Sequence, residues 1–316
     1  MSHRLLPLLL AAWLGLSGLQ AETVAPLSFT GPEVLKLDWT TRSMKAADIN
    51  GDGLNDFALI NNDRSKIEIF YQKGEGDAAL PKKKQISRNR WDPVLEDARF
   101  HGDSLSIGYP LFDLAVGDLN GDGRADLAYS SREVPLTIRY QGEAGVWIDL
   151  QEFDSFDALG WVQTVAIRDL DQDGANEVVV VSYDAIRIFA LGEDARLAEP
   201  EVYYLTGENP FNLLITDVTG DGLLDILYIT ASGKQSLALR QQASNGAFGP
   251  EYRFSFDRPI RSLEVFEEGG EQGPLFCSVD SRSGSLEFFH IEKSLCPLSE
   301  SDRSPTLIAQ SQSHHL

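Results

Sequence analysis

The chain is poor in the residues that build many familiar sites. It holds two cysteines and five histidines among 316 residues, and no cluster of either type stands at a metal-ligand spacing. This scarcity argues against soft-metal centres, which favour thiolate and imidazole ligands. The G-x-S-x-G, H-E-x-x-H and P-loop signatures are also missing. We therefore expect no enzyme; the alternative is an exported polysaccharide lyase or hydrolase.

Basic residues are scarce as well. The chain has 27 lysines and arginines against 48 acids, which gives a formal net charge of −21 at pH 7. A protein this acidic is repelled by nucleic acid and by anionic membrane surfaces, so neither is an expected partner. The same excess of acids is typical of a protein that carries many cation sites and is counted without its cations.

Long apolar runs are confined to the N-terminus. Residues 1–21, MSHRLLPLLLAAWLGLSGLQA, have the basic start, short apolar stretch and small-residue exit of a signal peptide. An uncleaved anchor is the alternative, but the run is short for a span of about 20 residues. We expect a secreted or periplasmic protein with no membrane insertion after cleavage. Such compartments permit a disulfide, and the sequence leaves open whether Cys277 and Cys296 pair.

One acidic pattern occurs four times. It reads ADINGDGLNDFALI at 47–60, GDLNGDGRADLAYS at 117–130, RDLDQDGANEVVVV at 168–181 and TDVTGDGLLDILYI at 216–229. Spacings of about 50 to 70 residues between copies point to a solenoid, a propeller or a linear array. Four short segments rich in branched and aromatic residues accompany each copy, which favours the four-stranded blade of a β-propeller.

The expected fold is all-β, a propeller of five four-stranded blades over residues 22–293 with a polar tail at 294–316. Residues 261–291 are interpreted as a fifth blade that has lost its acidic loop. Residues 32–39 resemble a fourth strand with no blade before it, so the N-terminal strand is expected to close the last blade. Closure removes exposed strand edges. The rival interpretation is a truncated copy of a larger propeller.

The pattern D-x-[DNT]-x-D-G-x-x-[DE] predicts a calcium loop. Hard cations take six to eight oxygens, and alternate residues of a tight loop can point inward. Glycine at position 6 allows the sharp turn, and position 7 can offer its carbonyl. The predicted ligands at positions 1, 3, 5, 7 and 9 are Asp48, Asn50, Asp52, Leu54 and Asp56; Asp118, Asn120, Asp122, Arg124 and Asp126; Asp169, Asp171, Asp173, Ala175 and Glu177; and Asp217, Thr219, Asp221, Leu223 and Asp225.

An Asp/Asn/Gly turn without metal is the simpler interpretation of any single loop. Four copies at one register favour calcium, with about four Ca²⁺ per chain. The first six positions also fit an EF-hand, but position 12 is Leu59, Tyr129, Val180 or Tyr228 rather than glutamate, and the flanks are strands. Whether calcium is required for folding or only stabilises the fold stays open.

The four loops, their strand flanks and the segment SNGAFGPEYRF at 244–254 resemble FG-GAP or VCBS repeats, as in the calcium-binding propeller of integrin α chains. The resemblance covers about residues 32 to 291, and it departs from the family in lacking a GAP tripeptide. It implies an extracellular adhesion or ligand-binding propeller. In integrins the blade calciums are structural, which the resemblance carries to these loops.

The first gap between copies is the longest and contains PKKKQISRNRW, with Lys82, Lys83, Lys84, Arg88, Arg90 and Trp91. A basic loop with an aromatic residue could bind an acidic glycan or a protein, and a solvated loop between blades is the simpler interpretation. The sequence thus predicts a secreted, monomeric, calcium-binding propeller that acts as a protein- or glycan-binding adhesion scaffold.

Overall fold

The computed structural model describes residues 35, 37–74, 99–192, 194–231, 233–256, 260–266, 274–279 and 286–291. The chain divides into two units, Met1–Leu35 and Lys36–Leu316, and every strand belongs to the second. The elements are β1 Thr41–Ala47, β2 Asp56–Asn61, β3 Lys66–Gln72, β4 Phe100–Ser106, β5 Leu111–Gly117, β6 Asp126–Ser131, β7 Leu136–Gln141, the 3-10 turn η1 Glu143–Gly145, β8 Trp147–Phe153, β9 Val165–Arg168, β10 Glu177–Val181, β11 Ala185–Phe189, β12 Glu201–Tyr204, β13 Phe211–Thr216, β14 Asp225–Ile229, β15 Leu237–Gln242, β16 Phe248–Phe254, β17 Leu263–Phe266, β18 Leu275–Val279 and β19 Leu286–Phe289.

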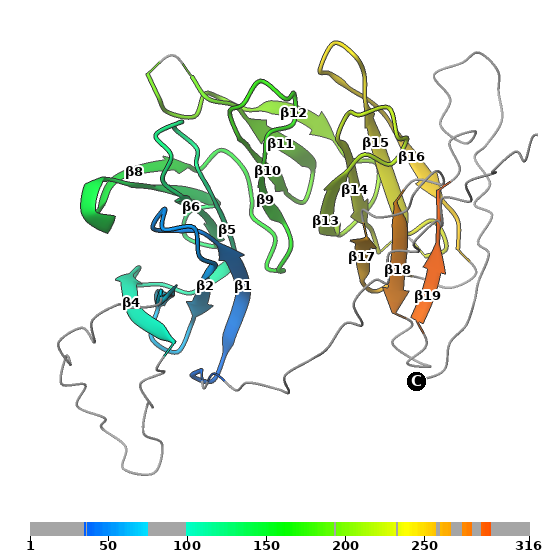
Figure 1. Cartoon of the computed structure of the whole chain (residues 1–316). Helices are drawn as coiled ribbons and strands as arrows, with labels where there is room; N and C mark the ends of the chain where they lie inside the picture. The colour runs from blue at the N-terminus through cyan, green and yellow to red at the C-terminus, as the bar shows by residue number, and fades with distance from the viewer. Residues whose placement is uncertain are drawn as a thin grey trace, which may run out of the picture. The chain divides into compact units, whose positions relative to one another are not determined.

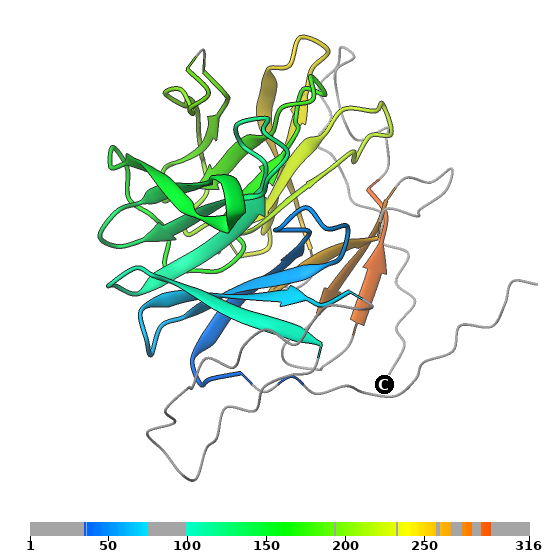
Figure 2. The same cartoon turned by 60° about the vertical axis from the view of Figure 1, so that its left-hand side comes forward.

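These strands form five antiparallel sheets (Figures 1 and 2). Four sheets hold four strands in chain order, β1–β4, β5–β8, β9–β12 and β13–β16, and the fifth holds β17–β19 in the described part of the chain. The first strand of each sheet contacts the first strand of the next, from β1 to β5, β9, β13 and β17. The fold is therefore the predicted all-β propeller of five blades.

Burial within a blade follows the strand order. The second strand lies between two neighbours and under the adjoining blades, so β10, EVVVV, is buried along its whole length. The fourth strand is an outer edge, and β12, EVYY, is mostly exposed. A continuous branched run is typical of a strand covered on both faces, whereas an edge strand needs polar residues to remain soluble.

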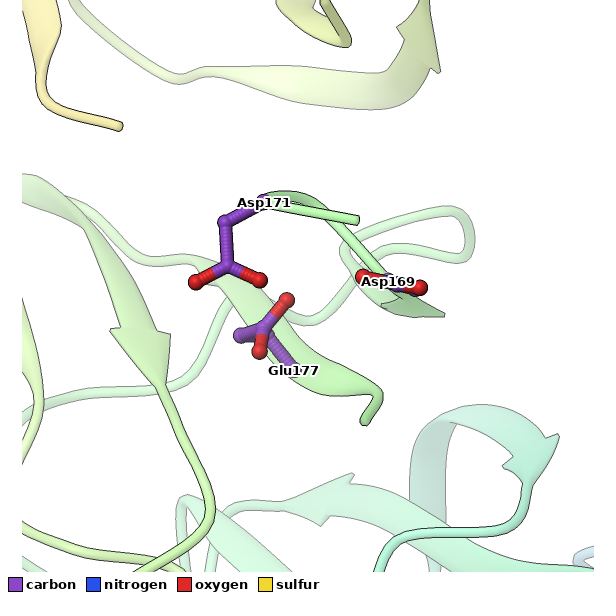
Figure 3. Close-up of side chains that lie close together, drawn as sticks. All are labelled: Asp169, Asp171 and Glu177. Carbon is purple, nitrogen blue, oxygen red and sulfur yellow. The ribbon is translucent and has the colours of Figure 1, made fainter. Parts of the chain in front are cut away.

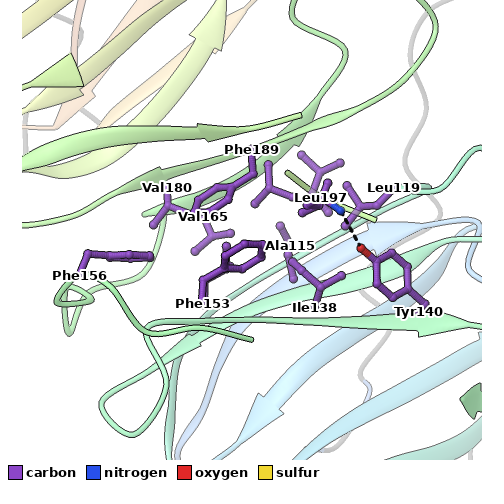
Figure 4. Packing of buried hydrophobic residues seen from close by; sticks show 14 residues of the cluster. Ala115, Leu119, Ile138, Tyr140, Phe153, Phe156, Val165, Val180, Phe189 and Leu197 are labelled. Carbon is purple, nitrogen blue, oxygen red and sulfur yellow. Dashed lines mark hydrogen bonds between the residues drawn. The ribbon is translucent and has the colours of Figure 1, made fainter. Parts of the chain in front are cut away.

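Apolar side chains of consecutive blades pack into a core between them. The core between the second and third blades includes Ile138, Phe153, Val165 and Phe189, with the rings of Phe153 and Phe189 4.6 Å apart (Figure 4). Equivalent clusters lie between the first and second blades, the third and fourth, and the fourth and fifth. Burying each such side chain contributes about 1.5–3 kcal/mol, so the sheets stabilise one another.

Polar contacts between first strands add to this packing. Ser43 donates its hydroxyl to Asp113 Oδ1 at 2.5 Å, and Asp113 Oδ2 accepts the amides of Thr164 and Val165 at 2.7 and 2.9 Å. Between the last two blades, Asn212 bonds both the amide and the carbonyl of Leu263 at 3.1 Å. These bridging side chains stand five residues before an acidic loop. They hold the starts of the first strands together.

Several predictions fall outside the described residues. These are the signal peptide at 1–21, the basic loop at 82–91, the tail at 294–316 and half of the closing strand expected at 32–39, whose described residues, 35 and 37–39, are not in a strand. Within the described residues no helix is long and apolar enough to cross a membrane. Cys277 is a buried free thiol, and Cys296 lies outside the description.

Candidate metal centre

Each acidic loop joins the first strand of a blade to the second. Position 6 is a glycine with positive φ in all four copies, at +84° in Gly53, +80° in Gly123, +93° in Gly174 and +89° in Gly222. Side chains rarely adopt this conformation, which explains why the pattern requires glycine there. The four loops therefore share one backbone plan.

The position 1 carboxylate organises that plan. In the first loop Asp48 Oδ1 accepts the amides of Gly51 at 2.8 Å and Asp52 at 3.1 Å, and Oδ2 accepts the amide of Gly53 at 2.8 Å. Asp118 and Asp217 make the same three contacts in the second and fourth loops. In these three loops both oxygens of the first predicted ligand already accept backbone amides.

Positions 3, 5 and 7 are also arranged alike. The position 5 carboxylate accepts the amide of position 7 in every loop, from Asp52 and Leu54 to Asp221 and Leu223, at 2.8–2.9 Å. The position 3 oxygen accepts the amide of position 5 in the first three loops, whereas Thr219 instead donates toward Asp217 at 3.5 Å. The position 5 side chain therefore holds the backbone of its own loop in all four copies, and the position 3 side chain does so in three.

The position 9 aspartates are fully buried between strands. Asp126 Oδ2 accepts the amide of Leu119 at 2.9 Å, and Oδ1 accepts the amide of Gln141, at the end of β7, at 2.8 Å. Asp56 and Asp225 bridge the corresponding positions. Burial raises the pKa of Asp56, and it raises the pKa of Asp126 and Asp225 to about 6, although these amide bonds oppose the shift. The carboxylate thus fastens the loop to the third strand.

The third loop departs from this arrangement. Glu177 Oε2 accepts the amide of Leu170 at 2.7 Å, and Leu191 stands where the other blades have Gln72, Gln141 and Gln242. Asp169 accepts one amide, that of Gly174, through Oδ2 at 3.1 Å. Its Oδ1 is buried and has no hydrogen-bond partner in the part of the chain that the structure describes. The third loop therefore keeps carboxylate lone pairs that the other loops use on their own backbone.

Three acids converge at this point. One carboxylate oxygen from each of Asp169, Asp171 and Glu177 lies within 4.8 Å of the others (Figure 3). Among the described residues, this is the group of three acids close enough to hold a metal ion; Asp173 lies outside it. Burial, followed by the charges of Asp171, Asp173 and Asp169, raises the pKa of Glu177 to about 7. An all-oxygen donor set of this kind suits a hard divalent cation.

In the second loop the arginine at position 7 pairs with a predicted ligand. Arg124 Nη2 lies 2.6 Å from Asp122 Oδ2, and its Nε donates to the Gln141 carbonyl at 3.2 Å. The pattern treats the side chain at position 7 as free because only its carbonyl would bind metal. In the structure this side chain partly neutralises a predicted ligand.

The sequence analysis also missed the glutamines whose backbone amides donate to the position 9 aspartates. Gln72, Gln141 and Gln242 offer their backbone amides to Asp56, Asp126 and Asp225. The signal was visible, because three of the four third-strand segments end in glutamine and the third blade has leucine instead. A glutamine at the end of the third strand therefore marks the blades in which the position 9 aspartate accepts a backbone amide from that strand.

Comparison with known proteins supports the repeat. The model of the FG-GAP-like repeat matches residues 48–129, 118–180 and 169–228, which together make up more than half of the chain. No curated protein matches the chain.

Among solved structures, one describes the recognition of non-reducing terminal N-acetylglucosamine by an Agrocybe aegerita lectin. It is 14% identical with a TM-score of 0.50, and the match covers 78% of this chain and 62% of the lectin chain. The Photorhabdus luminescens Tc holotoxin pore is 15% identical with a TM-score of 0.40, covering 80% of this chain and 11% of that one. BBS1N in complex with ARL6DN is 10% identical with a TM-score of 0.41, covering 78% and 79%. The likeness to the lectin shows the fold alone.

Proposed function

Because the chain belongs to the FG-GAP-like repeat family, we propose that it is an exported, calcium-binding propeller that binds a protein or glycan partner without transforming it. The observation that carries the calcium part is the convergence of one carboxylate oxygen from each of Asp169, Asp171 and Glu177, in a loop where Asp169 Oδ1 is buried without a hydrogen-bond partner among the described residues. A buried carboxylate oxygen without a hydrogen bond is costly, and a bound cation would supply the missing interaction.

Calcium fits this donor set better than its competitors do. The third loop offers carboxylate oxygens at positions 1, 3 and 9, and a carbonyl at position 7 would add a fourth ligand without further charge. Ca²⁺ accepts such flexible oxygen shells, whereas Mg²⁺ demands near-octahedral geometry and retains waters. Ca²⁺ bound there would stiffen the turn that joins β9 to β10.

Thermal unfolding in calcium and in chelator tests this part. Ca²⁺ that binds the folded state alone stabilises it by about 2.7 kcal/mol at a concentration 100 times Kd, so millimolar Ca²⁺ should raise the melting temperature of metal-stripped protein. Asp171→Asn should reduce that rise. Asn55→Ala is a matched control because Asn55 is an exposed amide of the first loop. Equal melting with calcium and with chelator would overturn the calcium proposal.

The surface proposed for partner binding lies at the opposite end of the blades. Each first strand runs toward its acidic loop, so the residues that precede it lie at the other end. Trp39 precedes β1 and is 81% exposed; Trp161 precedes β9 and is 57% exposed. Arg42 connects these segments, because its Nη2 donates to the Gly160 carbonyl at 3.4 Å. Tryptophan and arginine dominate the energetics of many interfaces, which supports recognition here.

Glycan and protein screens on the full chain test the partner. The Agrocybe aegerita lectin is described as recognising non-reducing terminal N-acetylglucosamine, which makes glycans ending in this sugar the first probes. Trp161→Ala should abolish or strongly weaken capture, whereas Phe266→Ala, which removes an exposed aromatic at the loop end of β17, should leave it intact. Equal capture by Trp161→Ala and wild type would exclude this surface, and cleavage of a captured glycan would indicate an enzyme.

A further inference from the structure

We propose that the four acidic loops form one hydrogen-bonded belt, so that a cation bound in the third loop changes the affinity of the second and fourth loops. This inference rests on the calcium-binding function proposed above. It is carried by three amide side chains, Gln141, Asn176 and Gln172, each of which donates from one blade to a carbonyl in the acidic loop of another.

The link between the third and fourth loops is Gln172. It occupies position 4 with a φ of +62°, where the other loops have Gly51, Gly121 and Gly220. Its Nε2 donates to the carbonyl of Gly222 in the fourth loop. The same peptide unit donates its other end, the Leu223 amide, to Asp221 Oδ1 at 2.9 Å. Gln172 therefore polarises the peptide that positions a predicted ligand of the next site.

The link between the third and second loops is Asn176. It stands at position 8, one residue before Glu177, and its Nδ2 donates to the carbonyl of Asp118 at 2.8 Å. Asp118 is position 1 of the second loop, and its carboxylate accepts the amides of Gly121 and Gly123 at 2.8 Å. Any movement of the third loop around position 9 is thus transmitted to the backbone of the first predicted ligand in the second loop.

The link between the second and first loops is Gln141. Its buried Nε2 donates to the carbonyl of Ala125 in the second loop at 2.9 Å and to that of Ile49 in the first at 3.1 Å. The chain of contacts therefore runs through all four loops. The third loop contributes the linking side chain on both of its sides, which makes it the hub.

This geometry defines the expected coupling. A cation held by positions 1, 3 and 9 of the third loop fixes the backbone at positions 4 and 8, where Gln172 and Asn176 stand. Each link is one hydrogen bond, whose typical contribution corresponds to about a two- to tenfold change in an equilibrium constant. By thermodynamic linkage, a cation bound in a neighbouring loop must raise the cation affinity of the third loop by the same factor.

Calorimetric titration of Ca²⁺ into the full metal-free chain tests the belt. Asp171→Ala should remove the third site and also weaken the second and fourth sites about two- to tenfold. Gln172→Gly, which gives the third loop the residue that the other loops have, should weaken the fourth site while the third keeps its ligands. Asn176→Ala should do the same to the second site. Asn55→Ala is the matched control, since it removes the same side chain at position 8 of the first loop, where no cross-loop bond exists in the described contacts.

The outcomes separate the two proposals. If wild type binds no Ca²⁺, both the function and the belt are overturned. If Asp171→Ala loses one site and the others keep their affinity, the calcium function stands and the belt is wrong. In the Asp171→Ala background, Gln172→Gly should weaken the fourth site less than it does in the wild-type background, because an empty third loop no longer holds Gln172 in place. A full additional loss there would contradict the belt.

Discussion

The second and third acidic loops follow one sequence pattern, but their carboxylates have different hydrogen-bond and ion-pair partners. In the second, Asp126 bridges two backbone amides and Asp122 is paired with Arg124. In the third, Glu177 accepts one amide and Asp169 Oδ1 accepts none from the described residues. The carboxylates of the second loop are therefore largely paired within the chain, whereas the third loop keeps carboxylate oxygens that accept no amide among the described residues. A shared motif thus yields a candidate cation site with few free carboxylate oxygens in the second blade and one with more in the third.

The largest expected effect is a difference in stability loss between variants of Asp126 and Glu177, the position 9 acids of the second and third loops. Asp126→Ala leaves the amides of Leu119 and Gln141 unpaired in a buried site, so we expect it to lower the free energy of unfolding in chelator by about 2–5 kcal/mol. Glu177→Ala should cost less under the same conditions, because Glu177 bonds one amide and is surrounded by like charges. Urea denaturation of both variants measures this. Equal losses would remove the distinction between the loops.

The next effect concerns calcium itself. Asp171→Asn should lower the affinity of the third site at least tenfold, about 1.4 kcal/mol, because it removes a charge from the converging group. Asp173→Asn should lower it less, since Asp173 lies outside that group and accepts the Ala175 amide. Calorimetry in the same buffer gives both values. A larger loss for Asp173→Asn would show that the ligand set differs from the one the structure brings together.

How far the sequence predicts the protein differs between the fold and the site. The blades follow from local patterns, because a branched run such as EVVVV, a glycine at a left-handed turn and repeated spacing act independently of distant contacts. The site depends on contacts across strands. Nothing in D-x-D-x-D-G-x-x-E shows that Leu191 follows β11 where Gln141 ends β7, or that Arg124 turns back on Asp122. Those details decide which carboxylates remain available.

The smallest expected effect is on the calcium affinity of the second loop. Arg124→Leu removes the guanidinium that lies 2.6 Å from Asp122 and takes the residue found at position 7 of the first and fourth loops. The Asp122 carboxylate should then be freer for a cation, and we expect the calcium affinity of the second site to rise about two- to fivefold, in line with the modest strength of a partly exposed ion pair. An unchanged affinity would mean that Arg124 does not compete with calcium.

The most direct test of the account is a crystal structure of the full chain grown with millimolar Ca²⁺. The account predicts an ion in the third loop within roughly 2.3–2.6 Å of oxygens from Asp169, Asp171 and Glu177. Occupancy of that loop should be at least as high as in the second, where Arg124 lies beside Asp122. An empty third loop beside an occupied second loop would contradict it.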